Sequence, residues 1–490
     1  ENEIGIRLRA TQQNPSVLPA ESLYAIEHDT MDTTFRSMYQ GLYIYLSARK
    51  ERRDLLLSQR PPRFDESLDS MISRSEDDFT RIALKAKAAQ DYFLLIGPPG
   101  TGKTSCALKK MVETFHADKD AQILLLSYTN RAVDEICKSL ASIAPAVDFI
   151  RVGSELSCDE AYRGHLIENE LSSCNRRSEV YERIRNCRII VGTVAAISGK
   201  PELFRLKHFD VAIIDEATQI LEPQLLGILC ARGEDGKDAI DKFVLIGDHK
   251  QLPAVVQQNT EQSAIYDESL LSIGLANLKD SLFERLYRNC TATVHRSYDM
   301  LCRQGRMHPE VALFANRAFY GGRLIPVGLP HQIESSDTIC RLAFYPSVPE
   351  KAGASAKINY SEARIVADLA ARIYEDHQTD FDESRTLGII TPYRSQIALI
   401  KKEIESLGIP ALNRILVDTV ERFQGSERDV IIYSFCVNYP YQLKFLSNLT
   451  EEEGVLIDRK LNVALTRARK QMFITGVPEL LERNPLYKSL

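Results

Sequence analysis

The stretch YFLLIGPPGTGKTS, residues 92–105, decides the fold class of this chain. Five apolar residues have the character of a buried strand, and the pattern G-x-x-x-x-G-K-[ST] follows them directly, before a segment of helical character. Glycines in that position let backbone N–H groups curl around phosphates, and the helix N-terminus adds partial positive charge. Lys103 can then reach the β- and γ-phosphates of a nucleoside triphosphate, and the Thr104 hydroxyl can bind Mg²⁺. A chance glycine-rich turn is the alternative, but the strand and helix around it favour a phosphate site.

Short apolar runs alternate with amphipathic segments on both sides of this loop. The first series of runs is 92–96, 122–127, 188–192, 210–215 and 242–247, and the second is 386–391, 414–419, 429–434 and 471–476. Such alternation is typical of a parallel sheet covered by helices on both faces. The predicted fold class is therefore α/β, with two units in tandem at 76–299 and 300–490. A helical insertion is expected near 153–187, and residues 256–300 are expected to join the units loosely.

The N-terminal part has a different character. Residues 1–32 alternate weakly and are interrupted by prolines, as at the end of a small β domain. Apolar residues recur at helical spacing from residue 33 to 60, where two prolines follow. This pattern predicts one long helix, a stalk, and a linker that together occupy 33–75.

Composition excludes several classes of protein. At 490 residues the chain should form two or three domains. Its net charge of −6 does not indicate nucleic-acid binding, although a local basic groove can bind phosphates whatever the net charge of the chain. The ten cysteines include no C-x-x-C pair, which is typical of reduced cysteines in an intracellular protein, cytoplasmic or, in a eukaryote, nuclear. We find no apolar run long enough to span a membrane and no signal peptide. A chain that begins with Glu1 rather than Met is expected to be a fragment.

Polar residues follow two further strands of the first unit. In VAIIDEATQ (211–219), Asp215 is expected to hold Mg²⁺ and Glu216 to activate the attacking water, while a helix-capping acid pair is the alternative. In LIGDHKQLPAVV (245–256), Gln251 has an amide suited to sensing a γ-phosphate, or is a loop glutamine. The second unit has no phosphate loop of its own, but it carries Arg306 and Arg467, and an arginine from another domain can stabilise the charge of phosphoryl transfer.

These motifs together resemble a known family. The ordered set is GPPGTGKT, SYTNRAVDEI, GTVAAI, DEATQ, GDHKQLP, RMHPE, TPYRSQ, VDTVERFQGSERD and LNVALTRAR. It is similar to the motifs of superfamily 1 type B helicases, above all to the helicase region of the replication helicase–nucleases that process Okazaki flaps, and also to the nonsense-mediated-decay helicases. The resemblance implies two RecA-like domains with ATP in the cleft, single-stranded nucleic acid across their top, and residues 1–32 as the end of a β-barrel.

The resemblance also implies roles for individual residues. The ATPase site would consist of Lys103, Thr104, Asp215, Glu216, Gln251, Arg306 and Arg467, with Thr104 and Asp215 as Mg²⁺ ligands. The nucleotide would further contact Gly97, Pro98, Gly100, Thr101, Gly102, Ser105 and Glu427. The strand would be contacted by Thr129, Asn130, Thr193, Tyr393, Arg394 and Thr419. Taken singly, each hydroxyl in this set could equally be a helix cap or a turn residue.

The chain departs from the family pattern at several positions. Gly305 stands where the family usually has a tyrosine beside the arginine of RMHP, and Thr80 stands where a glutamine often reads adenine. The 490 residues contain no Glu-x-Lys, which the family's nuclease core needs, so any nuclease is expected upstream of Glu1 or on another chain.

Three functions remain open at this point. The first is an ATP-dependent 5′→3′ helicase or translocase on single-stranded DNA, acting in replication or repair. The second is the same motor on RNA, because phosphate contacts do not read the 2′-OH. The third is a P-loop ATPase regulator that does not move along a strand.

Overall fold

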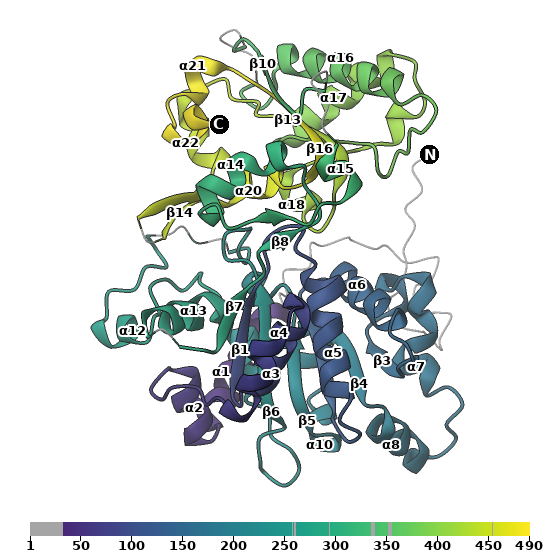
Figure 1. Cartoon of the computed structure of the whole chain (residues 1–490), viewed down its shortest axis with the longest axis vertical. Helices are drawn as coiled ribbons and strands as arrows, with labels where there is room; N and C mark the ends of the chain where they lie inside the picture. The colour runs from purple at the N-terminus through teal and green to yellow at the C-terminus, as the bar shows by residue number, and fades with distance from the viewer. Residues whose placement is uncertain are drawn as a thin grey trace, which may run out of the picture.

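The computed structural model describes residues 33–256, 258, 261–293, 295–334, 339–350, 355–452 and 454–490. The predicted end of a small β domain, residues 1–32, lies outside these ranges. Figure 1 shows two lobes, one from the purple and teal part of the chain and one from the green and yellow part. Each lobe contains its own parallel sheet, which confirms the α/β fold class.

The first sheet has seven parallel strands in the order β3-β4-β2-β5-β6-β1-β7. Their bounds are β1 Tyr92–Ile96, β2 Ile123–Ser127, β3 Phe149–Val152, β4 Ile189–Thr193, β5 Phe209–Ile214, β6 Ile240–Gly247 and β7 Tyr298–Met300. The five predicted runs are all present, and β1 pairs on one side with β6 and on the other with β7. The order brings the carboxyl ends of β1, β5 and β6 together, and these are the strands that precede the phosphate loop, the acid pair and Gln251.

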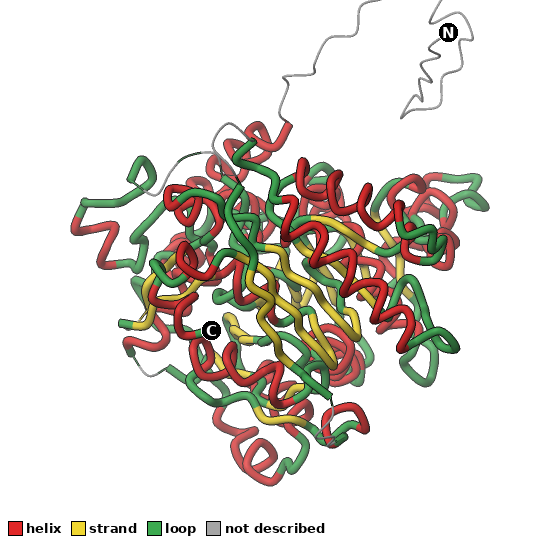
Figure 2. The backbone as a smooth tube through the Cα atoms, turned by 90° about the horizontal axis from the view of Figure 1, so that it is seen from above, coloured by secondary structure: helices red, strands yellow, loops and turns green. Residues whose placement is uncertain are grey.

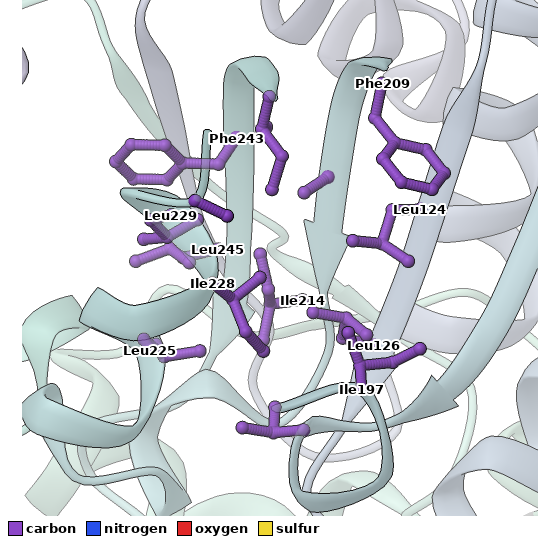
Figure 3. Close-up of a cluster of buried hydrophobic side chains, with 14 of the residues drawn as sticks. Leu124, Leu126, Ile197, Phe209, Ile214, Leu225, Ile228, Leu229, Phe243 and Leu245 are labelled. Carbon is purple, nitrogen blue, oxygen red and sulfur yellow. The ribbon is translucent and has the colours of Figure 1, made fainter. Parts of the chain in front are cut away.

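Helices cover both faces of this sheet. On one face α4 (Asp78–Ala88), α5 (Lys109–His116) and α6 (Asn130–Ala141) pack on alternate strand residues such as Phe93 and Leu125. On the other face lie α9 (Val194–Ser198), α10 (Glu202–Leu206), α11 (Glu222–Leu229) and α13 (Leu282–Ala292). Figure 3 shows this second core, with Leu225 and Ile228 of α11 beside Ile214. The two close-packed layers fix the positions of the loops at the strand ends.

Two expectations for this lobe are wrong. The single helix expected over 33–60 is two helices, α1 (Thr33–Ser47) and α2 (Lys50–Leu56), because Arg49 has an extended backbone. The connection over 256–300 is not loose, since α12 (Glu268–Ser272), α13 and β7 lie in it and Phe283 is fully buried in the same core as Leu225 and Ile228. Residues 153–187 contain short helical turns together with α7 (Ile167–Glu170) and α8 (Arg177–Asn186).

The second sheet has five parallel strands in the order β10-β16-β13-β11-β12. They are β10 Leu342–Pro346, β11 Leu387–Ile390, β12 Leu416–Asp418, β13 Arg428–Ser434 and β16 Ala468–Gly476. One face is covered by α16 (Tyr360–Asp376) and α17 (Arg394–Ser406), and the other by α14 (Pro309–Tyr320), α18 (Val420–Phe423) and α20 (Arg459–Leu465). In the view from above, helices flank the strands (Figure 2). The remaining elements are α3 Asp69–Arg74, β8 Arg303–Gln304, β9 Ile325–Pro326, α15 Pro330–Ile333, α19 Leu443–Leu446, the hairpin β14 Leu449–Glu452 and β15 Val455–Asp458, α21 Pro478–Leu481 and α22 Pro485–Ser489.

Candidate active site

The loop after β1 has the backbone that a phosphate cradle requires. Gly100 and Gly102 have φ of +73° and +74°, a region that L side chains rarely adopt. At Gly97 an added Cβ would lie 2.7 Å from the Cβ of Lys103, so a larger residue would displace the lysine. The Thr101 hydroxyl donates to the Pro98 carbonyl over 2.7 Å and closes the turn. The positive φ angles and the close contact with Lys103 therefore require glycine at these positions of the motif.

The acid pair after β5 meets the two polar residues that follow this loop. The Thr104 hydroxyl donates to Asp215 Oδ2 over 2.5 Å, and Lys103 Nζ lies 2.8 Å from Glu216 Oε1. Glu216 has φ of +54°, a conformation that costs free energy in a non-glycine residue and is concentrated at active sites. Gln219 Nε2 donates to the other oxygen of the Glu216 carboxylate over 2.9 Å. The structure thus brings together four side chains that are up to 113 positions (216 − 103) apart in the sequence.

Burial and charge set different protonation behaviour for the two acids. Burial, and then the neighbouring Glu216 carboxylate, raise the pKa of Asp215 to about 6. Burial also acts to raise the pKa of Glu216, but Lys103 outweighs it and holds that pKa below its ordinary value. The pKa of Lys103 is raised despite its burial, because Glu216 and Asp215 face it. Glu216 is therefore kept ionised, as a general base must be.

This donor set fits the phosphates of ATP with Mg²⁺. A hydroxyl and a carboxylate, from Thr104 and Asp215, are the oxygen ligands that Mg²⁺ takes in phosphate sites. The absence of a side chain at Gly97 leaves room for the Lys103 side chain beside the loop. The fit of the residues supports ATP and Mg²⁺ as the cofactors.

The second unit reaches this site with two arginines. Arg467, which is 2% exposed, donates from Nη2 to the Gln251 Oε1 over 3.2 Å, and Gln251 Nε2 donates to Asp248 Oδ2 over 2.7 Å. Burial, and then the nearby charge of Arg306, lower the pKa of Arg467 to about 9. Sequence reasoning missed Asp248, although it follows strand β6 just as Asp215 follows β5, and that repeated strand-then-carboxylate signal could have found it.

Arg306 lies directly against the phosphate loop. The Gly305 N–H donates to the Gly100 carbonyl over 2.8 Å, and a Cβ on Gly100 would lie 2.4 Å from the Cβ of Arg306. The Arg306 guanidinium donates from Nε to Glu427 Oε2 over 2.5 Å, and Nη1 donates to the Thr466 carbonyl over 3.2 Å. The cation holds the pKa of Glu427 below its ordinary value although burial acts to raise it. Glu427 is thus the partner of an arginine that lies against the phosphate loop.

The structure shows what surrounds the two positions that depart from the family pattern. A Cβ on Gly305 would lie 3.2 Å from Leu329 Cδ1 and 3.4 Å from Val327 Cγ2, so these side chains occupy the space beside the glycine. Thr80 donates its hydroxyl to Asp77 Oδ2 over 2.5 Å, and this carboxylate also caps helix α4. Thr80 is therefore engaged in a local helix cap.

Comparison with known proteins agrees with this geometry. Two family models, each described as an AAA domain, match residues 278–479 and, in two overlapping segments, 74–180 and 167–259. The DNA replication ATP-dependent helicase/nuclease DNA2 of Gallus gallus is 28% identical over 98% of this chain, and JHS1 of Arabidopsis thaliana, of the same description, is 29% identical over 98%. The chain belongs to the AAA-domain family.

The chain spans less than half of the DNA replication helicase/nucleases that it matches. It covers 45% of the Gallus gallus protein and 35% of the Arabidopsis thaliana protein. The DNA polymerase alpha-associated DNA helicase A of Saccharomyces cerevisiae is 24% identical, over 94% of this chain and 73% of that protein. An arterivirus nonstructural protein 10 helicase solved with DNA has a TM-score of 0.40 at 15% identity, over 82% of this chain and 65% of that one, a likeness too distant to say more about the fold.

The residues expected to contact a nucleic-acid strand lie at the carboxyl ends of four β-strands. Thr129 and Asn130 follow β2, Thr193 ends β4, Tyr393 and Arg394 follow β11, and Thr419 follows β12. All of them stand at or beside the N-terminus of the next helix, where backbone N–H groups and partial positive charge favour phosphate. The placement suits contacts to a phosphate backbone, but it also permits a purely structural role.

Hydrogen bonds distinguish these residues from one another. Thr129 and Thr193 accept from the N–H of Ala132 and Ala196 over 3.2 and 3.1 Å, so each caps a helix. Thr419 precedes α18 without a side-chain cap bond. The hydroxyls of the two capping threonines retain a donor, which a phosphate oxygen could accept.

The residues on the second sheet have other surroundings. Tyr393 is half-buried and accepts at its hydroxyl from Gln442 Nε2 over 3.2 Å, whereas Arg394 is exposed.

Within the described part of the chain, no helix is both long and apolar enough to cross a membrane.

Proposed function

We propose that this chain is the ATP-driven motor of a DNA helicase that moves 5′→3′ along single-stranded DNA in replication or repair. The observation that carries the proposal is the 3.2 Å hydrogen bond from Arg467 of the second unit to Gln251 of the first, the unit that holds the phosphate loop. A nucleotide bound there would touch both units, so its hydrolysis can change how they dock. The relatives are DNA helicases and DNA replication helicase/nucleases, which favours DNA as the strand that is bound.

The residues of the site divide the chemical work. Glu216, held ionised by Lys103, accepts the proton of the attacking water. Lys103, now 2.8 Å from Glu216, transfers its contact to the incoming phosphates. Mg²⁺ held by Thr104 and Asp215 would offset the charge of the phosphate oxygens. Arg467 and Arg306 stabilise the charge that develops on the leaving phosphates, as arginines supplied from a second domain do in related enzymes.

Movement requires a grip that does not depend on sequence. The set of Thr129, Asn130, Thr193, Tyr393, Arg394 and Thr419 is divided between the two sheets, so a change in docking changes the distance between two groups of phosphate contacts. The names of the relatives include a nuclease, but these 490 residues contain no Glu-x-Lys. A nuclease partner would therefore have to come from other residues or another chain. Such a function would take place inside the cell, in the nucleus of a eukaryote.

The test is the ATPase rate with and without nucleic acid. We expect single-stranded DNA to raise the rate of the wild type, and the Lys103→Ala variant to remain inactive with or without it. Stimulation by RNA alone would identify an RNA helicase instead, and no stimulation by either would leave a P-loop ATPase that does not move along a strand. Forked substrates with a 5′ or a 3′ tail then give the direction, and unwinding from a 3′ tail alone would contradict the proposed polarity.

A further inference from the structure

A buried hydrogen-bonded network lies behind Gln251 and joins the two units. Asp248 Oδ2 accepts from Gln251 Nε2 and from the Tyr320 hydroxyl, each over 2.7 Å. The Tyr320 hydroxyl in turn accepts from Asn462 Nδ2 over 2.8 Å, and the same amide donates to the Lys250 carbonyl over 2.7 Å. Tyr320 ends α14 and Asn462 lies on α20, so both belong to the second unit.

The direction of every bond in this network is fixed by chemistry. An ionised carboxylate only accepts, so Tyr320 and the Gln251 amide must both donate to Asp248. A guanidinium only donates, so Arg467 must face the oxygen of the Gln251 amide. The Gln251 side chain is thus held at both ends, its nitrogen by the first unit and its oxygen by the second. If the Gln251 amide were flipped, its hydrogen bonds to Asp248 and to Arg467 would both be lost.

The Tyr320 side chain combines this bond with full burial. It is 1% exposed and packs in the core of the second unit beside Phe319 and Leu461. Burial, and then the Asp248 charge, raise the pKa of Tyr320 well above its ordinary value, so the hydroxyl keeps its proton at any working pH. A phenylalanine would fill the same space and would remove the hydroxyl alone.

We propose that Tyr320 is a positioning residue for ATP hydrolysis: its hydroxyl, supported by Asn462, orients Asp248 and through it the Gln251 amide. The inference rests on the proposed function, because Gln251 matters only if the site hydrolyses ATP. Since Tyr320, Asn462 and Arg467 all come from the second unit, the network is complete only when the units are docked as they are here. Tyr320 therefore makes the orientation of Gln251 depend on docking.

The test is Tyr320→Phe in the full chain, assayed for ATPase with saturating single-stranded DNA. We expect kcat to fall about tenfold while KM for ATP stays within about twofold, because the lost bond orients a group and does not bind ground-state ATP. Tyr487→Phe is the matched control, since it removes another buried bond from a tyrosine to an aspartate, Asp458, over 2.6 Å in the same core. This control should keep kcat within about twofold of the wild type.

A double-mutant cycle separates positioning from general stability. If Tyr320 acts through Gln251, Tyr320→Phe should cost little more in a Gln251→Ala background, whereas a structural role would cost the same tenfold in both. Should Tyr320→Phe fail to fold, Asn462→Ala decides, because it keeps the tyrosine ring and removes the support of its hydroxyl. A wild type without ATPase activity would refute the proposed function, and an active wild type with Tyr320→Phe at full rate would refute this inference alone.

Discussion

The charges of Lys103 and Glu216 neutralise each other in this structure. Their side chains are 17% and 19% exposed and lie 2.8 Å apart, so each is the counter-ion of a largely buried partner. Removing one member of such a pair leaves an uncompensated charge in the site. In the proposed mechanism, phosphates replace Glu216 as the partner of Lys103, and the carboxylate becomes available to the attacking water.

Substitution of each member of this pair should give a distinct phenotype. Glu216→Gln is expected to bind ATP and to lose hydrolysis, because the amide cannot accept the proton of the water. Lys103→Ala is expected to abolish turnover by losing the contact to the phosphates. Fluorescent-nucleotide binding and steady-state ATPase assays measure the two properties separately. Wild-type turnover by Glu216→Gln would show that another group is the base.

Glu362 provides a test away from the active site. This carboxyl is fully buried, and burial raises its pKa to about 7 although the Ser434 hydroxyl and the Cys436 N–H donate to it. A raised acid pKa means that the folded state binds the proton more tightly than the unfolded state. The stability contributed by Glu362 is therefore present at low pH and is lost as pH rises from about 4.5 to 7.

We expect Glu362→Gln to weaken this pH dependence. Relative to the variant, the wild type should lose on the order of 3 kcal/mol of unfolding free energy between pH 4.5 and 7.5, from about 1.4 kcal/mol for each unit of pKa shift. Urea unfolding at a series of pH values measures the difference. Parallel curves for the two proteins would show that Glu362 titrates normally when folded.

At the scale of elements, the packing of α1 depends on two glycines. Gly41 on α1 meets Gly227 on α11, where a Cβ on Gly41 would lie 2.2 Å from the Pro223 carbonyl oxygen. The close approach lets α1 pack on the first unit (Figure 1), although its opposite face exposes Phe35 and Tyr39. Docking of this helix therefore depends on the absence of a side chain at one position.

Gly41→Ala should loosen α1 from α11. Overpacking of a close contact costs about 1–3 kcal/mol, and the better helix propensity of alanine returns only about 1 kcal/mol. Amide hydrogen exchange of α1 should become faster while that of β1 and β2 is unchanged. Gly164→Ala is the matched control, because open space surrounds Gly164. Gly236→Ala would not serve, since Gly236 has φ of +76°.

The strands that sequence patterns predicted and those that they missed differ in position. In the two large sheets the missed strands β3, β7 and β10 all lie at edges. β7 and β10 are only partly buried, and β7 is three residues long with Asp299 at its centre. In β3 the apolar run is interrupted by Arg151, which is buried against Asp134. Central strands are easy to predict because both of their faces are covered. Of the four edge strands of the two large sheets, only β12, in the predicted run 414–419, was found.

The same contrast applies to the active site. The order of the motifs was sufficient to predict that Thr104 and Asp215 lie close together, because both follow central strands of one parallel sheet. The pairing of Arg306 with Glu427, 121 positions apart, depends on how the loop after β8 meets the loop before β13. No local pattern encodes such a contact, and it required the tertiary structure.

At the scale of the whole molecule, the ATP site is a property of two lobes docked together. The phosphate loop belongs to the first lobe, and Arg467, from the helix end at α20, completes the site from the second. The lobes are also held by ion pairs away from the nucleotide, such as Arg459 with Glu284 and Lys250 with Glu452, 3.7 Å apart. Docking is therefore partly independent of Arg467.

Arg467→Ala should retain nucleotide binding and lose turnover by a factor of about 10³, the lower end of what arginine fingers contribute. Lys470→Ala is the control from the same basic stretch, since Lys470 pairs with Asp429 over 3.1 Å and is 34% exposed. Single-turnover ATPase measurements give the rate of the chemical step for both variants. Equal losses in the two variants would contradict the assignment of the finger to Arg467.

The pairing of β1 has a consequence for synthesis on the ribosome. β1 ends at Ile96, but its two neighbours begin at Ile240 and Tyr298, 144 (240 − 96) and 202 (298 − 96) positions later. At about 5–20 residues per second, the second neighbour follows roughly 10–40 s behind. Both edges of this apolar strand lack their partners until β6 is made, and one edge lacks its partner until β7 is made, so the nascent chain presents a template for aggregation. A chain with this topology is a natural client for chaperones that bind before translation ends.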